Sequence, residues 1–271
     1  MSLMRACVFM LTWLCVLPAF AADALDPVLA GIQGSDVEAM QVRTSVRAAP
    51  LLRGQLVQLV DAGQLKRIRV VADTAQPVVK DRPFAAAVVD KEMILTSGLL
   101  QQLRDAPRPH ALRSGDLAAD NLVFVLAHLA VHAGVSERHA QFERTLAEKM
   151  AAGLRDAQVK GTDFDATPMA QEALNHNMAI EANAYIAGWN AVVDAAQHQA
   201  SPNGAPLPEA QRAVLLGPLL LSFRYNQVLE RAMDGAQDQR VVLGADGIRA
   251  DTRNVFAIAQ ALMAGKMLEI Q

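Results

Sequence analysis

Apolar residues near the start of the chain recur with gaps of three and four. The pattern is clearest at Leu52, Leu56 and Leu59. Such spacing places apolar side chains on one face of a helix. It predicts two short helices within residues 26–63.

Two later stretches alternate between apolar and other residues and are rich in β-branched side chains. They lie at residues 67–72 and at residues 87–90, the second leading directly into residues 93–96. Alternation of this kind is typical of half-buried strands. It predicts a small sheet with a hairpin turn near residues 90–92.

The most apolar segment of the chain lies at residues 122–131, where nearly every side chain is apolar. It predicts a helix over residues 121–133 that is buried on most sides. Asp120 is suited to open this helix and Gly134 to end it. A second, charged amphipathic helix capped by Ser136 is expected to follow.

Helices are also expected elsewhere in the chain. One begins at Thr96 or Ser97 and ends before Pro107, and others cover residues 169–197, 209–233 and 254–268. Abundant alanine and an aromatic content of only 4% favour helices over sheets. The expected fold class is therefore α+β, with a mainly helical domain and a small β-sheet or hairpin.

Residues 1–21 have the features of a signal peptide. Arg5 precedes an apolar run over residues 7–20, and residues 19–21 (Ala-Phe-Ala) provide a cleavage site of small residues. Both cysteines of the chain lie within this segment, so the mature chain would have no disulfide. We expect a periplasmic or secreted protein without a membrane span after cleavage, the alternative being an uncleaved anchor.

The remainder, residues 22–271, is expected to form a single domain. Its core would cover residues 67–200, followed by C-terminal helices over residues 209–271. The net charge is −3, and acidic and basic residues are interspersed. No basic stripe is present, so nucleic-acid binding is not predicted.

Two histidines lie within the apolar helix, at positions 128 and 132. Their i, i+4 spacing puts both imidazoles on one helix face, which is how a single helix supplies two ligands to zinc. Buried imidazoles need partners for their ring nitrogens, and a metal ion supplies one. Hydrogen bonds to the backbone or to a carboxylate are the alternative. Glu181, on the helix at residues 169–197, is the candidate third ligand.

Three segments together resemble the M48 type of HExxH zinc metallopeptidases. Phe84-Ala85 followed by MILTSGLL at residues 93–100 is similar to the edge-strand hairpin of that family and the start of its next helix. HLAVH at residues 128–132 is similar to the HExxH helix, and EANAYIAG at residues 181–188 to the segment that carries the third ligand. The resemblance implies a zincin-like domain, zinc bound by His128, His132 and Glu181, and a peptide-binding edge.

The departures from the family pattern bear most directly on activity. The glutamate that moves the proton of zinc-bound water in the family is replaced by Leu129, which transfers no proton. Tyr185 replaces an aspartate that would orient a ligand, and Asn183 replaces a glutamate. Hydrolysis by the standard route is therefore not expected.

Other residues are secondary candidates. Tyr185, His139 and His176 could support the ligands, and Phe84, Ala85 and Ala86 could line the substrate edge. Glu137, His139 and Glu143 follow Gly134 on the charged helix, where a solvated face is the expected explanation.

Three functions remain open from the sequence. The first is an exported, non-catalytic metallopeptidase-like protein that binds zinc and a peptide or protein partner. The second is an active zinc-dependent hydrolase with a different base, such as Glu172, Glu181 or Tyr185. The third is a helical envelope protein without metal, whose histidines are buried and satisfied.

Overall fold

The computed structural model describes residues 23–79, 82–105, 117–201, 203–236 and 240–265. The signal peptide predicted at residues 1–21 lies outside these ranges, as do residues 106–116, which follow the helix expected to end before Pro107. The described residues form a mainly helical α+β fold, so the predicted class is confirmed. Within them, no helix is both long enough and apolar enough to cross a bilayer.

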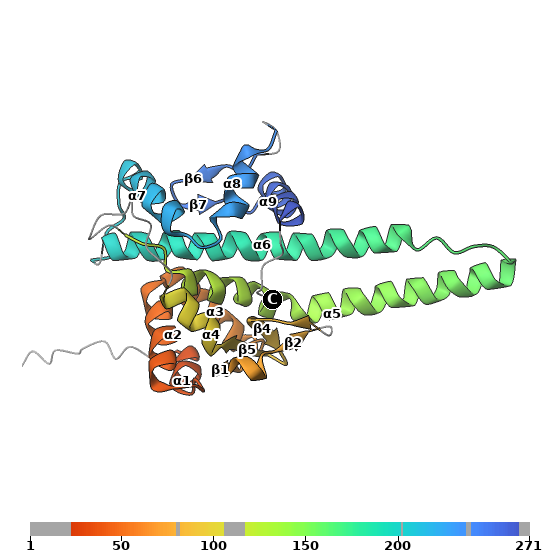
Figure 1. Ribbon diagram of the computed structural model, residues 1–271, viewed down its shortest axis with the longest axis horizontal. Coiled ribbons are helices and arrows are strands. Elements are labelled where there is room, and N and C mark those ends of the chain that lie inside the picture. The colour runs from red at the N-terminus through yellow and green to blue at the C-terminus, as the bar shows by residue number, and fades with distance from the viewer. Residues whose placement is uncertain (1–22, 80–81, 106–116, 202, 237–239, 266–271) are drawn as a thin grey trace, which may run out of the picture.

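Two long helices, α5 (Asn121–Lys160) and α6 (Thr167–Ala200), run side by side through the molecule (Figure 1). The N-terminal helices and the sheet pack on the α5 side, and the C-terminal elements pack on the α6 side. The N-terminal helices are α1 (Leu25–Ala30), α2 (Asp36–Ala48), α3 (Pro50–Asp61) and α4 (Ser97–Arg104). The C-terminal elements are α7 (Glu209–Ser222), α8 (Asn226–Asp234), β6 (Leu243–Gly244), β7 (Gly247–Ile248) and α9 (Thr252–Ala264).

The sheet has the order β1-β5-β4. Its strands are β1 (Arg67–Val71), β4 (Ala86–Val89) and β5 (Glu92–Thr96). A short hairpin of β2 (Val78–Val79) and β3 (Arg82–Pro83) lies between β1 and β4 in the chain. Strand β5 pairs in parallel with β1 and antiparallel with β4. Asp90 and Lys91 both have positive φ, as a two-residue hairpin turn requires. The predicted sheet and turn are confirmed, and β4 is an edge strand.

The prediction that Gly134 ends the apolar helix is wrong, because α5 continues through it to Lys160. A Cβ at Gly134 would lie 3.3 Å from Leu59 Cδ2, so this glycine allows close packing of α3 and does not cap a helix. Ser136 is not a cap either, since its hydroxyl donates to the carbonyl of Ala133 within the same helix. The helix ends at Gly161, which has a φ of 64° and the left-handed conformation of a C-cap.

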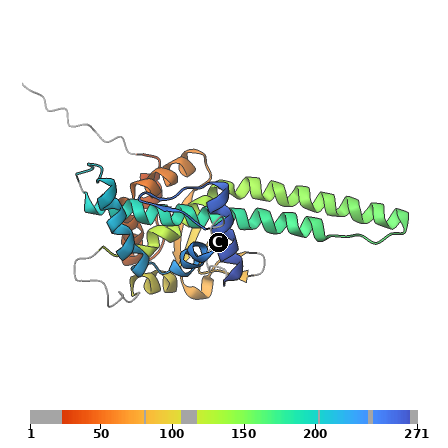
Figure 2. The ribbon, with the colours of Figure 1, turned by 90° about the horizontal axis from the view of Figure 1, so that it is seen from above.

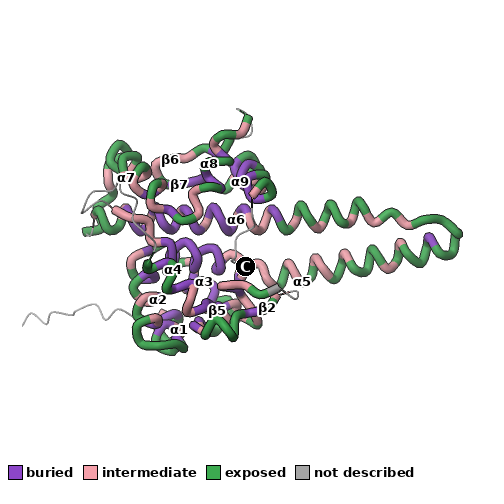
Figure 3. Tube along the Cα trace, viewed as in Figure 1, coloured by how far each residue is buried: buried purple, intermediate pink, exposed green. Residues whose placement is uncertain are grey.

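Beyond the compact part of the molecule, α5 and α6 continue as a helical arm (Figure 2). The helices are largely buried where other elements flank them, and toward the tip their residues are mostly exposed or intermediate (Figure 3). Near the tip, the ring of Phe164 in the connecting loop lies over Gly153. The sequence predicted two separate helices within residues 121–155. They form the single helix α5, which is buried in its first part and mostly exposed toward the tip of the arm.

Tertiary contacts also account for the other differences from the predicted helices. The two helices expected within residues 26–63 are α2 and α3, with Pro50 at the start of the second, and the short helix α1 precedes them as a third. The helix expected over residues 209–233 is interrupted at Phe223, which is extended and buried. Asn121 accepts the backbone N–H of Arg224 there. The segment between the helices expected over residues 209–233 and 254–268 contains the small β6–β7 hairpin.

Gly188 of α6 packs closely against Phe124 of α5. A Cβ at this position would lie 2.5 Å from Phe124 Cδ2 and 2.9 Å from the Phe124 carbonyl oxygen. We expect Gly188→Ala to lower the free energy of unfolding by about 1–3 kcal/mol, because the backbone oxygen has no freedom to move away. The midpoint of urea denaturation measures this effect.

Gly54 is a matched control for this substitution. It is an exposed residue within α3, and a Cβ there meets nothing within 4 Å. Gly54→Ala should therefore raise stability by about 0.5–1 kcal/mol through helix propensity alone. Equal effects of the two substitutions would contradict the close approach of α5 and α6.

Candidate metal centre

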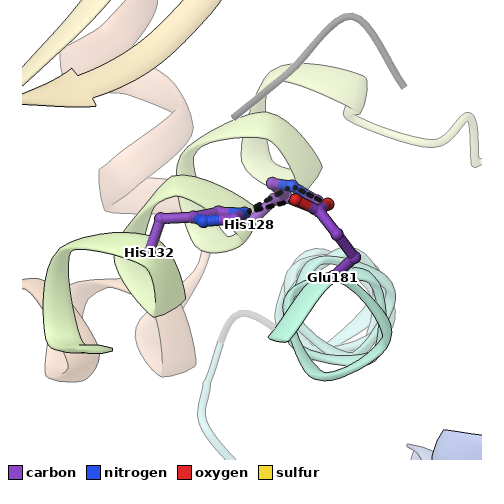
Figure 4. A group of neighbouring side chains, drawn as sticks. All are labelled: His128, His132 and Glu181. Carbon is purple, nitrogen blue, oxygen red and sulfur yellow. Dashed lines mark hydrogen bonds and ion pairs between the residues drawn. The ribbon is translucent and has the colours of Figure 1, made fainter. Parts of the chain in front are cut away.

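Three side chains from α5 and α6 point toward one another (Figure 4). The Nε2 atoms of His128 and His132 are 3.2 Å apart. The Glu181 carboxylate places one oxygen 3.5 Å from His128 Nε2 and the other 3.5 Å from His132 Nε2. The structure thus brings together the three residues that the sequence singled out as ligands.

The position of the group follows from the two helices. His128 and His132 are one turn apart on α5, and α6 packs along that face so that Glu181 lies opposite them. His128 is completely buried, whereas the side chains of His132 and Glu181 are 12% and 15% exposed. One side of the group therefore remains open to solvent.

The protonation states suit cation binding. Burial opposes ionisation of Glu181, but hydrogen bonds from His128 and His132 and their charges lower its pKa to about 2. Burial also lowers the pKa of His128, outweighing the opposite effect of Glu181. At neutral pH the group therefore contains a carboxylate beside a neutral imidazole, which are the forms that bind metal ions.

These three side chains could hold a metal ion. Ligands about 2.0–2.1 Å from a tetrahedral ion lie about 3.3 Å from one another, close to the observed separations. Both histidines present Nε2, so a bound ion would leave the proton of His128 on Nδ1. This buried nitrogen has no hydrogen-bond partner among the described residues. Because such partners orient and strengthen metal-bound histidines, the site lacks one usual support.

Leu129 follows His128 directly in α5 but does not take part in the group of His128, His132 and Glu181. Its side chain is completely buried and belongs to the main hydrophobic core. The position that carries the proton-transferring glutamate in the resembling family is therefore part of the packing of α5 here.

The other residues that the sequence brought into question near the site, Tyr185, Asn183 and Glu172, make their contacts away from His128, His132 and Glu181. The hydroxyl of Tyr185 donates to the carbonyl of Tyr225 at 2.7 Å, and its ring packs edge-on against Phe124. Burial raises the pKa of this hydroxyl. Asn183 donates to the carbonyl of Ala179. Glu172 is exposed and pairs with Lys149 at 3.1 Å on the arm.

A cavity of about 600 Å³ adjoins the open side of the group. Its polar lining includes His132, Glu181, Ser136, Asn177, His139 and Glu143. Its apolar lining includes Phe84, Val88, Val135, Leu174, Met178 and Ile180. The volume lies within the range of about 300–1,000 Å³ typical of small-ligand sites.

The face expected to be solvated beyond Gly134 also contributes to the cavity. His139 and Glu143 line the cavity and pair with each other at 3.4 Å, and their side chains are 24% and 43% exposed. Glu137 is indeed exposed and pairs with Lys91. His176 stacks on His139 with ring centroids 5.4 Å apart. It is not among the residues that line the cavity, so its contact is with His139 and not with His128, His132 or Glu181, which we call the metal-ligand group.

The residues proposed for the substrate edge fall in different environments. Phe84 lines the cavity, Ala85 uses its carbonyl to accept the N–H of Thr96, and Ala86 is completely buried. Sequence reasoning missed Val88, which lies on β4 and lines the cavity. Its place two residues beyond Ala86 on an alternating strand was the available signal.

Comparison of the chain with protein-family models, with curated proteins and with solved structures found no match. The resemblance to M48 peptidases therefore stays a prediction from the three sequence segments. The chemistry of the site has to be argued from the geometry of this chain.

Proposed function

We propose that the protein is an exported zinc-binding protein that holds a peptide or protein partner without hydrolysing it. The observation that carries the proposal is the convergence of His128, His132 and Glu181 within 3.2–3.5 Å beside an open cavity. Two imidazole nitrogens and a carboxylate suit zinc, and three protein ligands leave a position for a further ligand. When bound, zinc would act as a Lewis acid toward that ligand.

The absence of hydrolysis is supported by the residues around the group. Leu129 has no proton to exchange, and Tyr185 donates its hydroxyl to Tyr225. The acid–base pair that shares the cavity begins at His139, seven residues after His132 on the same helix. This spacing corresponds to about 10 Å along the helix axis, beyond the reach of direct proton transfer at the metal.

The proposal predicts zinc binding without zinc-dependent proteolysis. Protein purified without chelator should contain about one zinc per chain by elemental analysis, as a three-ligand site requires. Glu181→Gln should lose most of this zinc, because the amide keeps the shape of the side chain and removes its charge. Unfolded casein should remain intact with wild-type protein.

Two outcomes would overturn the proposal in different ways. Protein without zinc would favour a helical protein whose histidines are merely buried. Casein cleavage that chelator abolishes and His128→Ala removes would favour an active hydrolase.

A further inference from the structure

On the helical arm, α5 has one face in contact with α6 and a second, apolar face beside it. The ring of Phe142 stacks on His176 of α6 with centroids 3.8 Å apart. One further contact between the two helices is the ion pair of Lys149 with Glu172. A second set of side chains lies about a third of a turn around α5 from the face that makes these contacts. It consists of Ala147, Met150, Ala151 and Leu154, which we call the outer stripe.

The outer stripe is open to solvent. Met150 is 38% exposed and Leu154 is 52% exposed. In the compact part of the molecule other elements cover α5 and α6, whereas the described residues of the arm are these two helices and their connecting loop (Figure 2). Apolar side chains spaced by three and four residues form the surface with which one helix packs on another. An exposed surface of this kind marks an interaction site.

The charges beside the outer stripe favour one direction for a helix packed on it. Arg144, Glu148 and Arg155 follow one edge of the stripe, and all three are exposed. None of them has a hydrogen-bond or ion-pair partner within the part of the chain that the structure describes. If two copies of α5 packed in parallel, Glu148 would face Glu148 and Arg155 would face Arg155. Antiparallel packing instead puts Glu148 of each copy beside Arg155 of the other.

The antiparallel register that pairs these charges also fits the apolar side chains. With Glu148 of each copy beside Arg155 of the other, helix periodicity places Leu154 of each copy opposite Ala151 of the other. A large side chain then meets a small one at both symmetry-related positions. The outer stripe is therefore complementary to itself in charge and in shape.

The two ends of the arm favour the same direction. The connecting loop at the tip carries Asp163 and Asp165, both exposed. Arg144 lies toward the base of the arm, and antiparallel packing brings it near the tip of the other copy. Unlike charges therefore meet at both ends of the paired arms.

We propose that the arm is a dimerisation element, and that its outer stripe packs antiparallel on the outer stripe of a second copy of this chain about a two-fold axis. The two arms then form a four-helix bundle, the arrangement in which paired helical hairpins bury such stripes. The contact is short, so the dissociation constant is expected at about 1–100 μM. Zinc takes no part in this contact, so the dimer stands or fails separately from the proposed function.

Sedimentation velocity over concentrations of about 1–500 μM tests the dimer. The wild-type protein should pass from monomer to dimer within this range, and Leu154→Asp should raise the dissociation constant at least about 10-fold. Leu221→Asp is a matched control, because Leu221 is 54% exposed and lies on α7, at the opposite end of the molecule from the arm (Figure 1). The control should dimerise like the wild type. A wild type that stays monomeric, or an equal loss in both variants, would overturn the proposal.

Charge reversal tests the antiparallel register. Glu148→Arg and Arg155→Glu should each weaken dimerisation by about 10-fold, because each variant brings like charges together at both edge contacts. A one-to-one mixture of the two variants should regain the wild-type affinity, since both contacts in the mixed dimer join unlike charges. The double variant should regain it as well. Dimerisation that the single reversals leave unchanged, or that neither the mixture nor the double variant restores, would overturn the proposal.

Discussion

Replacing His132 by alanine is expected to abolish the stabilisation that zinc gives to the folded protein. The two histidines and Glu181 lie within 3.2–3.5 Å of one another only when α5 and α6 are packed, so zinc binds the folded state preferentially. A ligand present at 100 times its dissociation constant adds about 2.7 kcal/mol to the free energy of unfolding. In a protein of this size that corresponds to a rise in melting temperature of roughly 5–10 °C. Calorimetric melting with and without zinc measures it.

His198→Ala is a suitable control for this experiment. His198 is exposed in the last turn of α6, so its loss removes an imidazole without touching the metal-ligand group. The His198 variant should show the same zinc-dependent shift as wild type, and the His132 variant should show none. A shift of equal size in all three proteins would place the bound zinc elsewhere. A wild-type melting temperature that zinc does not change would indicate that His128 and His132 are ordinary buried side chains.

The metal-ligand group illustrates which parts of a site are predictable from sequence. His128 and His132 are neighbours through helix periodicity alone, which is a local property. Glu181 was indicated by its resemblance to a family segment, and its position opposite the histidines depends on how α6 packs on α5. Local rules could not exclude the alternative that Glu181 is a solvated surface residue.

The fold shows the same division between local and tertiary causes. The hairpin turn at Asp90 and the capping of α4 by Thr96 follow from local chemistry, and both were predicted. Gly134 carries a local signal for a helix end, yet α3 packs against it and the helix continues. Once α5 is continuous, His139 and Glu143 remain in register with His132 and line the same cavity. The place of Glu143 in the cavity was not predicted, because it depends on one helix that sequence reasoning divided into two.

Replacing Leu129 by glutamate, the residue at this position of the HExxH motif that HLAVH resembles, is expected to destabilise the protein and to produce no casein hydrolysis. Leu129 is completely buried within the hydrophobic core, so a carboxylate there would lose its hydration without gaining a charged partner. Such substitutions cost about 3 kcal/mol or more. The melting temperature should fall by roughly 10 °C. Circular dichroism during heating and a casein assay measure the two effects.

Leu129→Met distinguishes the effect of charge from that of altered packing, because methionine keeps the apolar character and nearly the volume of leucine. This variant should lose less than about 1.5 kcal/mol. A Leu129→Glu protein that melts like the methionine variant and cleaves casein in a chelator-sensitive manner would contradict the burial of this position. It would show that one missing carboxylate separates this chain from an active peptidase. The expected outcome instead identifies Leu129 as a packing residue of α5, because its side chain is buried in the core while His128 and His132 converge with Glu181.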